Sequence, residues 1–290
     1  MRKTFFAAFI LFAFAAVAAA QVAMPRVSQR QEIAQVIGDT KISMVYHRPN
    51  VNGRKIWDGL VPYGKVWRAG ANEATLFEVD RDVNINGKPL PAGKYSFHVI
   101  PTANEWTLIF NKDEGQWGSF SYNEKDDALR ITAKPHMSHH PHEALTYMFD
   151  DPKADSVKVV LAWENLAVPF TVDIGDLHGR ILSQIRDEHS KADEAKKVNF
   201  LNQFASYVAT NKLAANYAEA MEKIDASIAV RENYSNLATK SRLLAAQGKY
   251  SEAIALAEKA LATGKAATPP VNPNMMAVLE GEIADWKTKL

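Results

Sequence analysis

Two hydrophobic periods divide this sequence, and the point where one replaces the other constrains the fold most strongly. From about Lys41 to Ile174, apolar side chains alternate with polar ones, as in strands that bury one face. After Gly175 the apolar residues recur every three or four positions, as in amphipathic helices. The two patterns are segregated rather than interleaved. They predict an α+β protein and argue against a succession of βαβ units.

The first region has the pattern of an antiparallel β-sandwich or barrel. Alternating runs cover residues 42–46, 95–99, 106–110, 145–149, 157–163 and 168–174. Asn86-Gly87 stands between short apolar runs, which is typical of a tight hairpin because both turn positions favour positive φ. We therefore expect a β-rich domain over residues 21–174 and a helical domain over residues 175–290.

One stretch of the helical region resembles the second half of a tetratricopeptide repeat. It begins at Gln247, and Gly248 would allow the tight turn between two helices. Tyr250, Ala253 and Ala260 would then pack the helices together. The first half departs from the repeat pattern, and one clear copy is visible. We expect an α-helical bundle with one tetratricopeptide-like hairpin, which would meet a protein partner.

Residues 1–20 have the pattern of a secretory signal peptide. A basic start, Arg2-Lys3, precedes an apolar run at 5–17 and the small residues Ala18 to Ala20. An uncleaved anchor is the alternative, although the apolar core is short for a membrane span. We expect an exported protein, periplasmic or secreted, with no membrane span after cleavage because no other long apolar run follows.

Charge and composition argue against several functions. The chain has no cysteine, which excludes disulfides, thiolate metal sites and thiol nucleophiles. Its 34 basic and 33 acidic residues nearly cancel and form no basic block, so we expect no nucleic-acid partner. Neither a glycine-rich phosphate loop nor a Gly-x-Ser-x-Gly or His-Glu-x-x-His motif is present, and we expect no cofactor.

The stretch from Tyr46 to Thr75 concentrates side chains that bind ligands, and it is long for a connection between strands. Guanidinium groups bind carboxylate, phosphate or sulfate in two-pronged geometry, and aromatic faces stack on sugars. Together these groups predict a site for an anionic or sugar-like ligand. The candidate binding residues are Tyr46, Arg48, Arg54, Trp57, Trp67, Arg68, Asn72, Glu73 and His98.

Two other interpretations of these residues stay open. In the first, Trp57 and Trp67 plug the end of the sandwich while the arginines pair with acidic groups and carbonyls inside the loop. In the second, the protein is an exported hydrolase in which Glu73 and His98 form an acid–base pair beside the arginines. Exposed arginines on an aromatic surface would favour a binding or scaffolding module of the cell envelope, and convergence of Glu73 with His98 would favour the hydrolase.

Four histidines, His136, His139, His140 and His142, fall within seven residues. Such a cluster could bind zinc, nickel or copper. Pro135 and Pro141 instead indicate an irregular segment. We therefore expect a solvated loop between Ile131 and Leu145, and no metal.

The motifs of this loop also resemble a known family. Tyr-x-Arg-Pro at 46–49, Leu-Val-Pro-Tyr-Gly at 60–64 and Trp-Arg-x-Gly-Ala-Asn-Glu-Ala-Thr at 67–75 closely resemble the exported bacterial family called domain of unknown function 2911. The resemblance runs from about Pro25 to Ile174. It implies export, a β-rich fold and a frequent helical extension, and it implies no particular activity. His98 stands where the family pattern leads us to expect an apolar residue.

Overall fold

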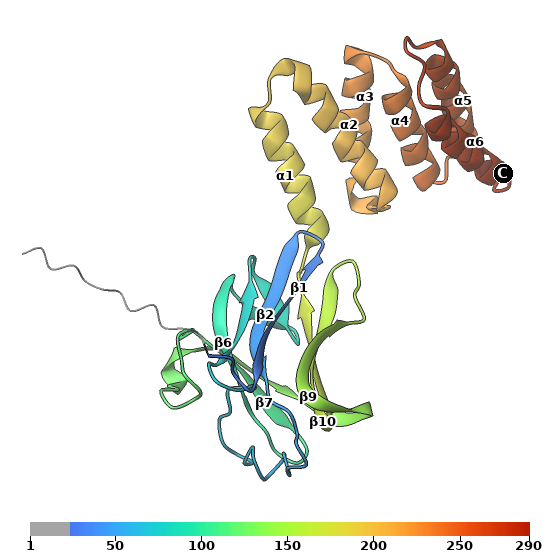
Figure 1. Ribbon diagram of the computed structural model, residues 1–290. Coiled ribbons are helices and arrows are strands. Elements are labelled where there is room, and N and C mark those ends of the chain that lie inside the picture. The colour runs from blue at the N-terminus through green and yellow to red at the C-terminus, as the bar shows by residue number, and fades with distance from the viewer. Residues whose placement is uncertain (1–23) are drawn as a thin grey trace, which may run out of the picture. The chain divides into compact units, whose positions relative to one another are not determined.

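The computed structural model describes residues 24–290, and the chain divides into two compact units, with the boundary in the sequence between Gly175 and Asp176 (Figure 1). Strands form the first unit and α-helices form the second. The predicted segregated α+β fold is thus confirmed. The predicted signal peptide lies outside the described residues. Among the helices of residues 24–290, none combines the length and apolar character needed to cross a membrane.

Two antiparallel sheets build the first unit as a sandwich. One sheet has the order β1-β2-β3-β6-β7-β8 and the other has the order β5-β4-β10-β9. The strands are β1 (Gln29–Ile37), β2 (Thr40–Arg48), β3 (Thr75–Val79), β4 (Val83–Ile85), β5 (Lys88–Leu90), β6 (Gly93–Ile100), β7 (Trp106–Asn111), β8 (Asp127–Ala133), β9 (His136–Asp150) and β10 (Ser156–Asp173).

Aromatic rings from both sheets meet in the core between them. The ring centroid of Phe170 on β10 lies 5.5 to 6.0 Å from those of Phe77, Phe97 and Phe110 on β3, β6 and β7. All four side chains are buried. Phe97, Phe110 and Phe170 lie in the predicted runs 95–99, 106–110 and 168–174, so the alternation in those runs correctly marks the inward face. Phe77 lies outside the predicted runs.

The predicted hairpin at Asn86-Gly87 is confirmed. The two residues join β4 to β5 with φ values of 47° and 78°, in the left-handed region that this turn requires. The predicted runs 157–163 and 168–174 do not form two strands, because residues 157–163 and 168–173 lie on one long strand, β10. Glu164, with φ of 53°, accompanies a shift of register between β10 and β9.

The expectation of a solvated loop between Ile131 and Leu145 is wrong. His136 is the first residue of β9, and it pairs with Ala167 of β10. Pro141 fits this strand because β9 lies at the edge of its sheet, where a missing N–H group is tolerated. Most side chains at the start of β9 are exposed, so this part of the strand leaves no apolar alternation in the sequence.

Two long irregular segments connect strands of the first unit. Residues 49–74 connect β2 to β3, as the sequence predicts, without adding a strand to either sheet. Residues 112–126 connect β7 to β8 and end in a short 3₁₀ helix, Glu124–Asp126. This second segment lies over the outer face of the six-stranded sheet, where its Ser119 and Gln116 contact His98 and Ser96 of β6.

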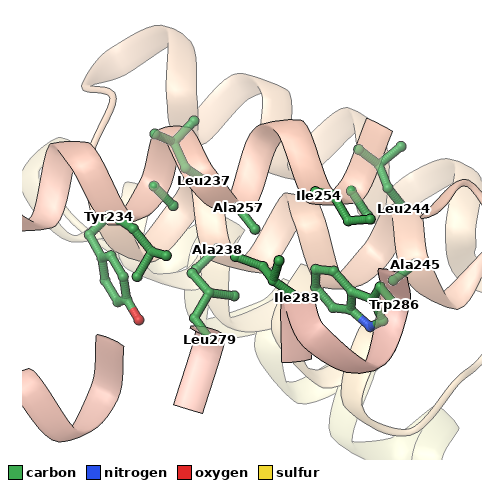
Figure 2. Packing of buried hydrophobic residues seen from close by; sticks show 13 residues of the cluster. Tyr234, Leu237, Ala238, Leu244, Ala245, Ile254, Ala257, Leu279, Ile283 and Trp286 are labelled. Atoms are coloured by element: carbon green, nitrogen blue, oxygen red, sulfur yellow. The ribbon is translucent and has the colours of Figure 1, made fainter. Parts of the chain in front are cut away.

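The second unit consists of antiparallel helices. They are α1 (Leu177–Lys191), α2 (Glu194–Thr210), α3 (Tyr217–Val230), α4 (Tyr234–Ala246), α5 (Tyr250–Ala266) and α6 (Pro273–Lys287). Gly248, with φ of 77°, lies in the turn between α4 and α5. Leu237, Ala257 and Trp286 belong to a cluster shared by α4, α5 and α6 (Figure 2). The likeness of the α4–α5 hairpin to a tetratricopeptide repeat stays a prediction.

Candidate functional site

Backbone hydrogen bonds fix the 49–74 segment at its start and at Trp67. At its start, Val51 N–H donates to the Glu143 carbonyl at 2.7 Å and Leu145 N–H donates to the Pro49 carbonyl at 3.0 Å. Further along, Trp67 and Val99 exchange two bonds of 2.8 and 2.9 Å. These bonds tie the segment to β9 and β6. Side chains on an otherwise irregular loop therefore occupy defined positions.

A cluster of tryptophans lies under this loop. Trp57 is buried, and its ring centroid lies 4.7 to 6.0 Å from those of Trp67, Trp106 and Trp163. Trp67 is half-buried and donates from Nε1 to the Gly70 carbonyl at 3.1 Å. Trp57 therefore belongs to the core, and Trp67 forms the outer layer of the same cluster.

A pocket of about 360 Å³ opens beside the tryptophan cluster, and we call it the Arg54–Arg68 pocket. Two guanidinium groups and the indoles of Trp67 and Trp163 line it, and no acidic residue does. Its lining residues are Val27, Ser28, Pro49, Asn50, Asn52, Arg54, Leu60, Val61, Trp67, Arg68, Gly70, Ala71 and Trp163. The pocket therefore combines positive charge with flat apolar walls.

Arg48 and Arg54 both bond to backbone carbonyls. Arg48 donates from Nε to the Leu145 carbonyl at 2.9 Å and from a terminal nitrogen to Thr146 Oγ1 at 2.7 Å, which fixes it against β9. Arg54 is exposed and donates to the carbonyls of Val51 and Asn50. Because these carbonyls carry no net charge, the positive charge of Arg54 is not neutralised where it lines the pocket.

Arg68 is the least satisfied cation of the region. Its Nε–H is buried without a hydrogen-bond partner, and the guanidinium forms no ion pair within residues 24–290. Burial lowers the pKa of Arg68, because a charged group is less stable away from water. A buried cation normally has a counter-charge, so this position favours the approach of an anion.

Glu73 belongs to a neighbouring pocket of about 630 Å³. Its carboxylate pairs with Arg26 at 2.5 Å and lies 3.5 Å from His47 Nδ1. The hydrogen bond from Arg26 lowers the pKa of Glu73, and burial lowers the pKa of His47. Asn72 lies next to Glu73, and its side-chain amide donates to the Ser28 carbonyl at 3.4 Å, at the rim of the Arg54–Arg68 pocket.

The remaining sequence candidates lie elsewhere. Tyr46 is in the core, where its hydroxyl donates to Gln31 Oε1 at 2.7 Å. His98 is fully buried on the outer face of β6, where it bonds to Ser96 and Ser119. Glu73 and His98 thus each have their own partners. Arg54, Trp67 and Arg68 are the candidates that the structure gathers into one pocket.

Sequence reasoning missed several residues at these sites. Trp163 comes from the second sheet and Ser28 precedes β1, so neither belongs to the 49–74 segment. Ser119, the partner of His98, lies in a segment without any recognisable motif. Within residues 24–290, no group of three or more histidine, aspartate or glutamate side chains is placed to hold a metal ion, and His136, His139, His140 and His142 are spread along β9.

Comparison with known proteins gives one result. A family model described as "Protein of unknown function (DUF2911)" matches residues 28–172, which is half of the chain and spans the sandwich. No curated protein and no solved structure shows significant similarity to the chain.

Proposed function

The chain belongs to the DUF2911 family of proteins of unknown function, and we propose that its β-sandwich binds a small sugar acid in the Arg54–Arg68 pocket. The observation that carries this proposal is the unpaired guanidinium of Arg68 in a pocket without acidic lining residues. A carboxylate would supply the missing counter-charge, because guanidinium groups bind carboxylates through two parallel hydrogen bonds.

The walls of the pocket favour a sugar ring as the rest of the ligand. The C–H faces of a sugar stack on flat indole rings, such as that of the half-buried Trp67, which Trp163 supports from the core. The side chains of Asn50 and Asn52 offer donors and acceptors for hydroxyl groups. The volume of about 360 Å³ lies at the small end of the range for ligand sites, which favours one ring over a long chain.

The setting of this function is also part of the proposal. The pattern in residues 1–20 supports binding in the cell envelope or outside the cell. The helical unit would then contact a protein partner, as the tetratricopeptide-like stretch after Gln247 suggests. In this proposal the protein presents its ligand rather than transforming it.

The test is a titration of the purified chain with glucuronate and galacturonate, with glucose as the neutral counterpart. Calorimetry gives Kd, and thermal unfolding gives the rise of Tm that follows when a ligand binds the folded state. Arg68→Gln removes a charged hydrogen bond worth about 1.5–3 kcal/mol. The expected result is a Kd roughly 10- to 100-fold weaker for the sugar acids.

Arg81→Gln is the matched control, because Arg81 is an arginine of the same unit that pairs with Asp39 outside the pocket. We expect this variant to bind the sugar acids like the unchanged chain. Equal binding of glucose and glucuronate, or unchanged binding in Arg68→Gln, would contradict the proposal.

A further inference from the structure

A serine and a histidine form a close pair on the outer face of the six-stranded sheet, and neither of them lines the Arg54–Arg68 pocket. The hydroxyl oxygen of Ser119 lies 2.9 Å from Nδ1 of His98. His98 is fully buried on β6, whereas Ser119 is half-buried in the segment 112–126. The histidine is therefore shielded from water behind a serine that solvent can reach.

The position of the ring proton decides which imidazole nitrogen can accept another, and we assign it from the neighbouring hydrogen bonds. The Ser96 hydroxyl donates to the Asn111 carbonyl at 3.5 Å, and its oxygen receives a bond from Gln116 Nε2 at 3.3 Å. With its own proton directed to that carbonyl, Ser96 acts as an acceptor toward His98 Nε2, 3.1 Å away. Nε2 then carries the ring proton, and Nδ1 presents a lone pair to Ser119.

The ring of His98 is held by further contacts. Its centroid lies 5.3 Å from that of Tyr122, whose hydroxyl donates to Asp127 Oδ2 at 2.7 Å. Burial lowers the pKa of His98 to about 4, against the opposing attraction of Asp127 and Asp113. The imidazole is therefore neutral near pH 7 and free to accept a proton.

We propose that Ser119 is a nucleophile, that His98 is its general base, and that the pair attacks esters with an apolar acyl or alcohol group. Two exposed aromatic side chains beside Ser119 support this substrate class: Trp117 is 54% exposed and Phe120 is 86% exposed. Among residues 24–290, the backbone N–H groups of Ser119 and Phe120 donate to no backbone acceptor. In the proposal they are the donors to the oxyanion.

The reaction balances with water as the second substrate. The Ser119 oxygen bonds to the ester carbonyl carbon as its proton passes to Nδ1 of His98. The carbon–oxygen bond of the ester then breaks, and the alcohol leaves with the proton from Nδ1. Water attacks the acyl-serine through the same base, and this step releases the carboxylic acid and restores the Ser119 hydroxyl. A base as weak as His98 makes proton transfer slow, so covalent labelling is the more sensitive measurement.

The experiment uses diisopropyl fluorophosphate, which transfers a phosphoryl group to an activated serine and releases fluoride. Intact mass and peptide mapping of the full chain locate the adduct. We expect one adduct on Ser119 in the unchanged protein and none in Ser119→Ala. Ser121→Ala is the matched control, since Ser121 is an exposed serine of the same segment, and it should be labelled normally.

His98→Gln tests the base. Removal of a general base should slow labelling by roughly 100- to 10,000-fold. Thermal unfolding shows whether this variant folds, and the comparison of Ser119→Ala with Ser121→Ala tests the nucleophile independently of it. The proposal is overturned if the unchanged protein takes up no phosphoryl group, if the adduct lies on another residue, or if folded His98→Gln is labelled at the original rate.

Discussion

The indole of Trp67 stacks on that of Trp163, with ring centroids 5.7 Å apart and planes inclined by 19°. One ring belongs to the 49–74 segment and the other to β10, so the stack joins the loop to the second sheet. Trp57 stands nearly perpendicular to both rings, at 75° and 85°. The wall of the Arg54–Arg68 pocket is therefore continuous with the hydrophobic core.

This continuity predicts different effects for two tryptophans. Trp57→Ala should lower the free energy of unfolding by about 3–5 kcal/mol, because it leaves a cavity among three other indoles. Trp67→Phe keeps a ring in the half-buried outer layer, so it should lower the free energy of unfolding by less. It should also weaken the binding of sugar acids. Urea unfolding and calorimetric titration of both variants measure the two effects. A greater loss of stability in Trp67→Phe would contradict this division.

Two glycines test the position of Arg68. A β-carbon on Gly118 would lie 2.9 Å from an Arg68 terminal nitrogen, whereas one on Gly64 would meet nothing within 4 Å. Both residues have positive φ, 68° and 71°. Each change to alanine should therefore cost about 1–2 kcal/mol of stability. Gly118→Ala should in addition displace the guanidinium and weaken glucuronate binding, and equal Kd values for the two variants would count against the proposed site.

The burial of His98 predicts a pH dependence of stability. Its pKa is about 4 in the folded chain against 6.5 for the free side chain, so the unfolded state binds the extra proton. Stability should therefore be unaffected above pH 6.5 and should fall as the pH drops from 6.5 to 4. The difference between these two pKa values corresponds to a loss of roughly 3 kcal/mol in the free energy of unfolding. Urea unfolding across this range should show the loss, and a folded His98→Gln variant should lack that part of it.

The helical unit offers a matched pair of glycines. Gly264 of α5 is buried, and a β-carbon there would lie 2.9 Å from the ring of Tyr234. Gly281 of α6 has open space around it. Gly264→Ala should destabilise the unit because the ring must move, and Gly281→Ala should stabilise it by about 0.5–1 kcal/mol through helix propensity. Hydrogen exchange of the amides in α5 and α6 measures both changes in stability. If both variants stabilise the unit, or both destabilise it, the packing described around Tyr234 is wrong.

The alternating runs in the sequence correspond to β2, β6, β7, β10 and the later part of β9, and they miss β3, β8 and β1. The reason is clearest in β1. The side chains of Gln31, Ile33, Gln35 and Ile37 share the more buried face of that strand. Two glutamines interrupt the apolar period there, and Gln31 is satisfied by the hydroxyl of Tyr46. A polar residue with a buried partner on another strand leaves no signal in a local pattern.

The candidate site shows the same limit. Arg54, Trp67 and Arg68 come from one segment, so their residue types alone are enough to predict a binding site there. Trp163 reaches the same pocket through the packing of two sheets. The pairing of Ser119 with His98 depends on how the segment 112–126 lies over β6. Spacing in the sequence carries no information about that placement.

The attachment of the 49–74 segment to β9 also hinders self-association of the protein. An exposed edge strand is a template on which further chains can add and aggregate. Here Pro141 removes one donor from the outer edge of β9, and the backbone of residues 49–51 occupies the positions around 143–145. A second chain would have to displace that backbone before it could extend the sheet, so changes that loosen the start of the loop would favour self-association.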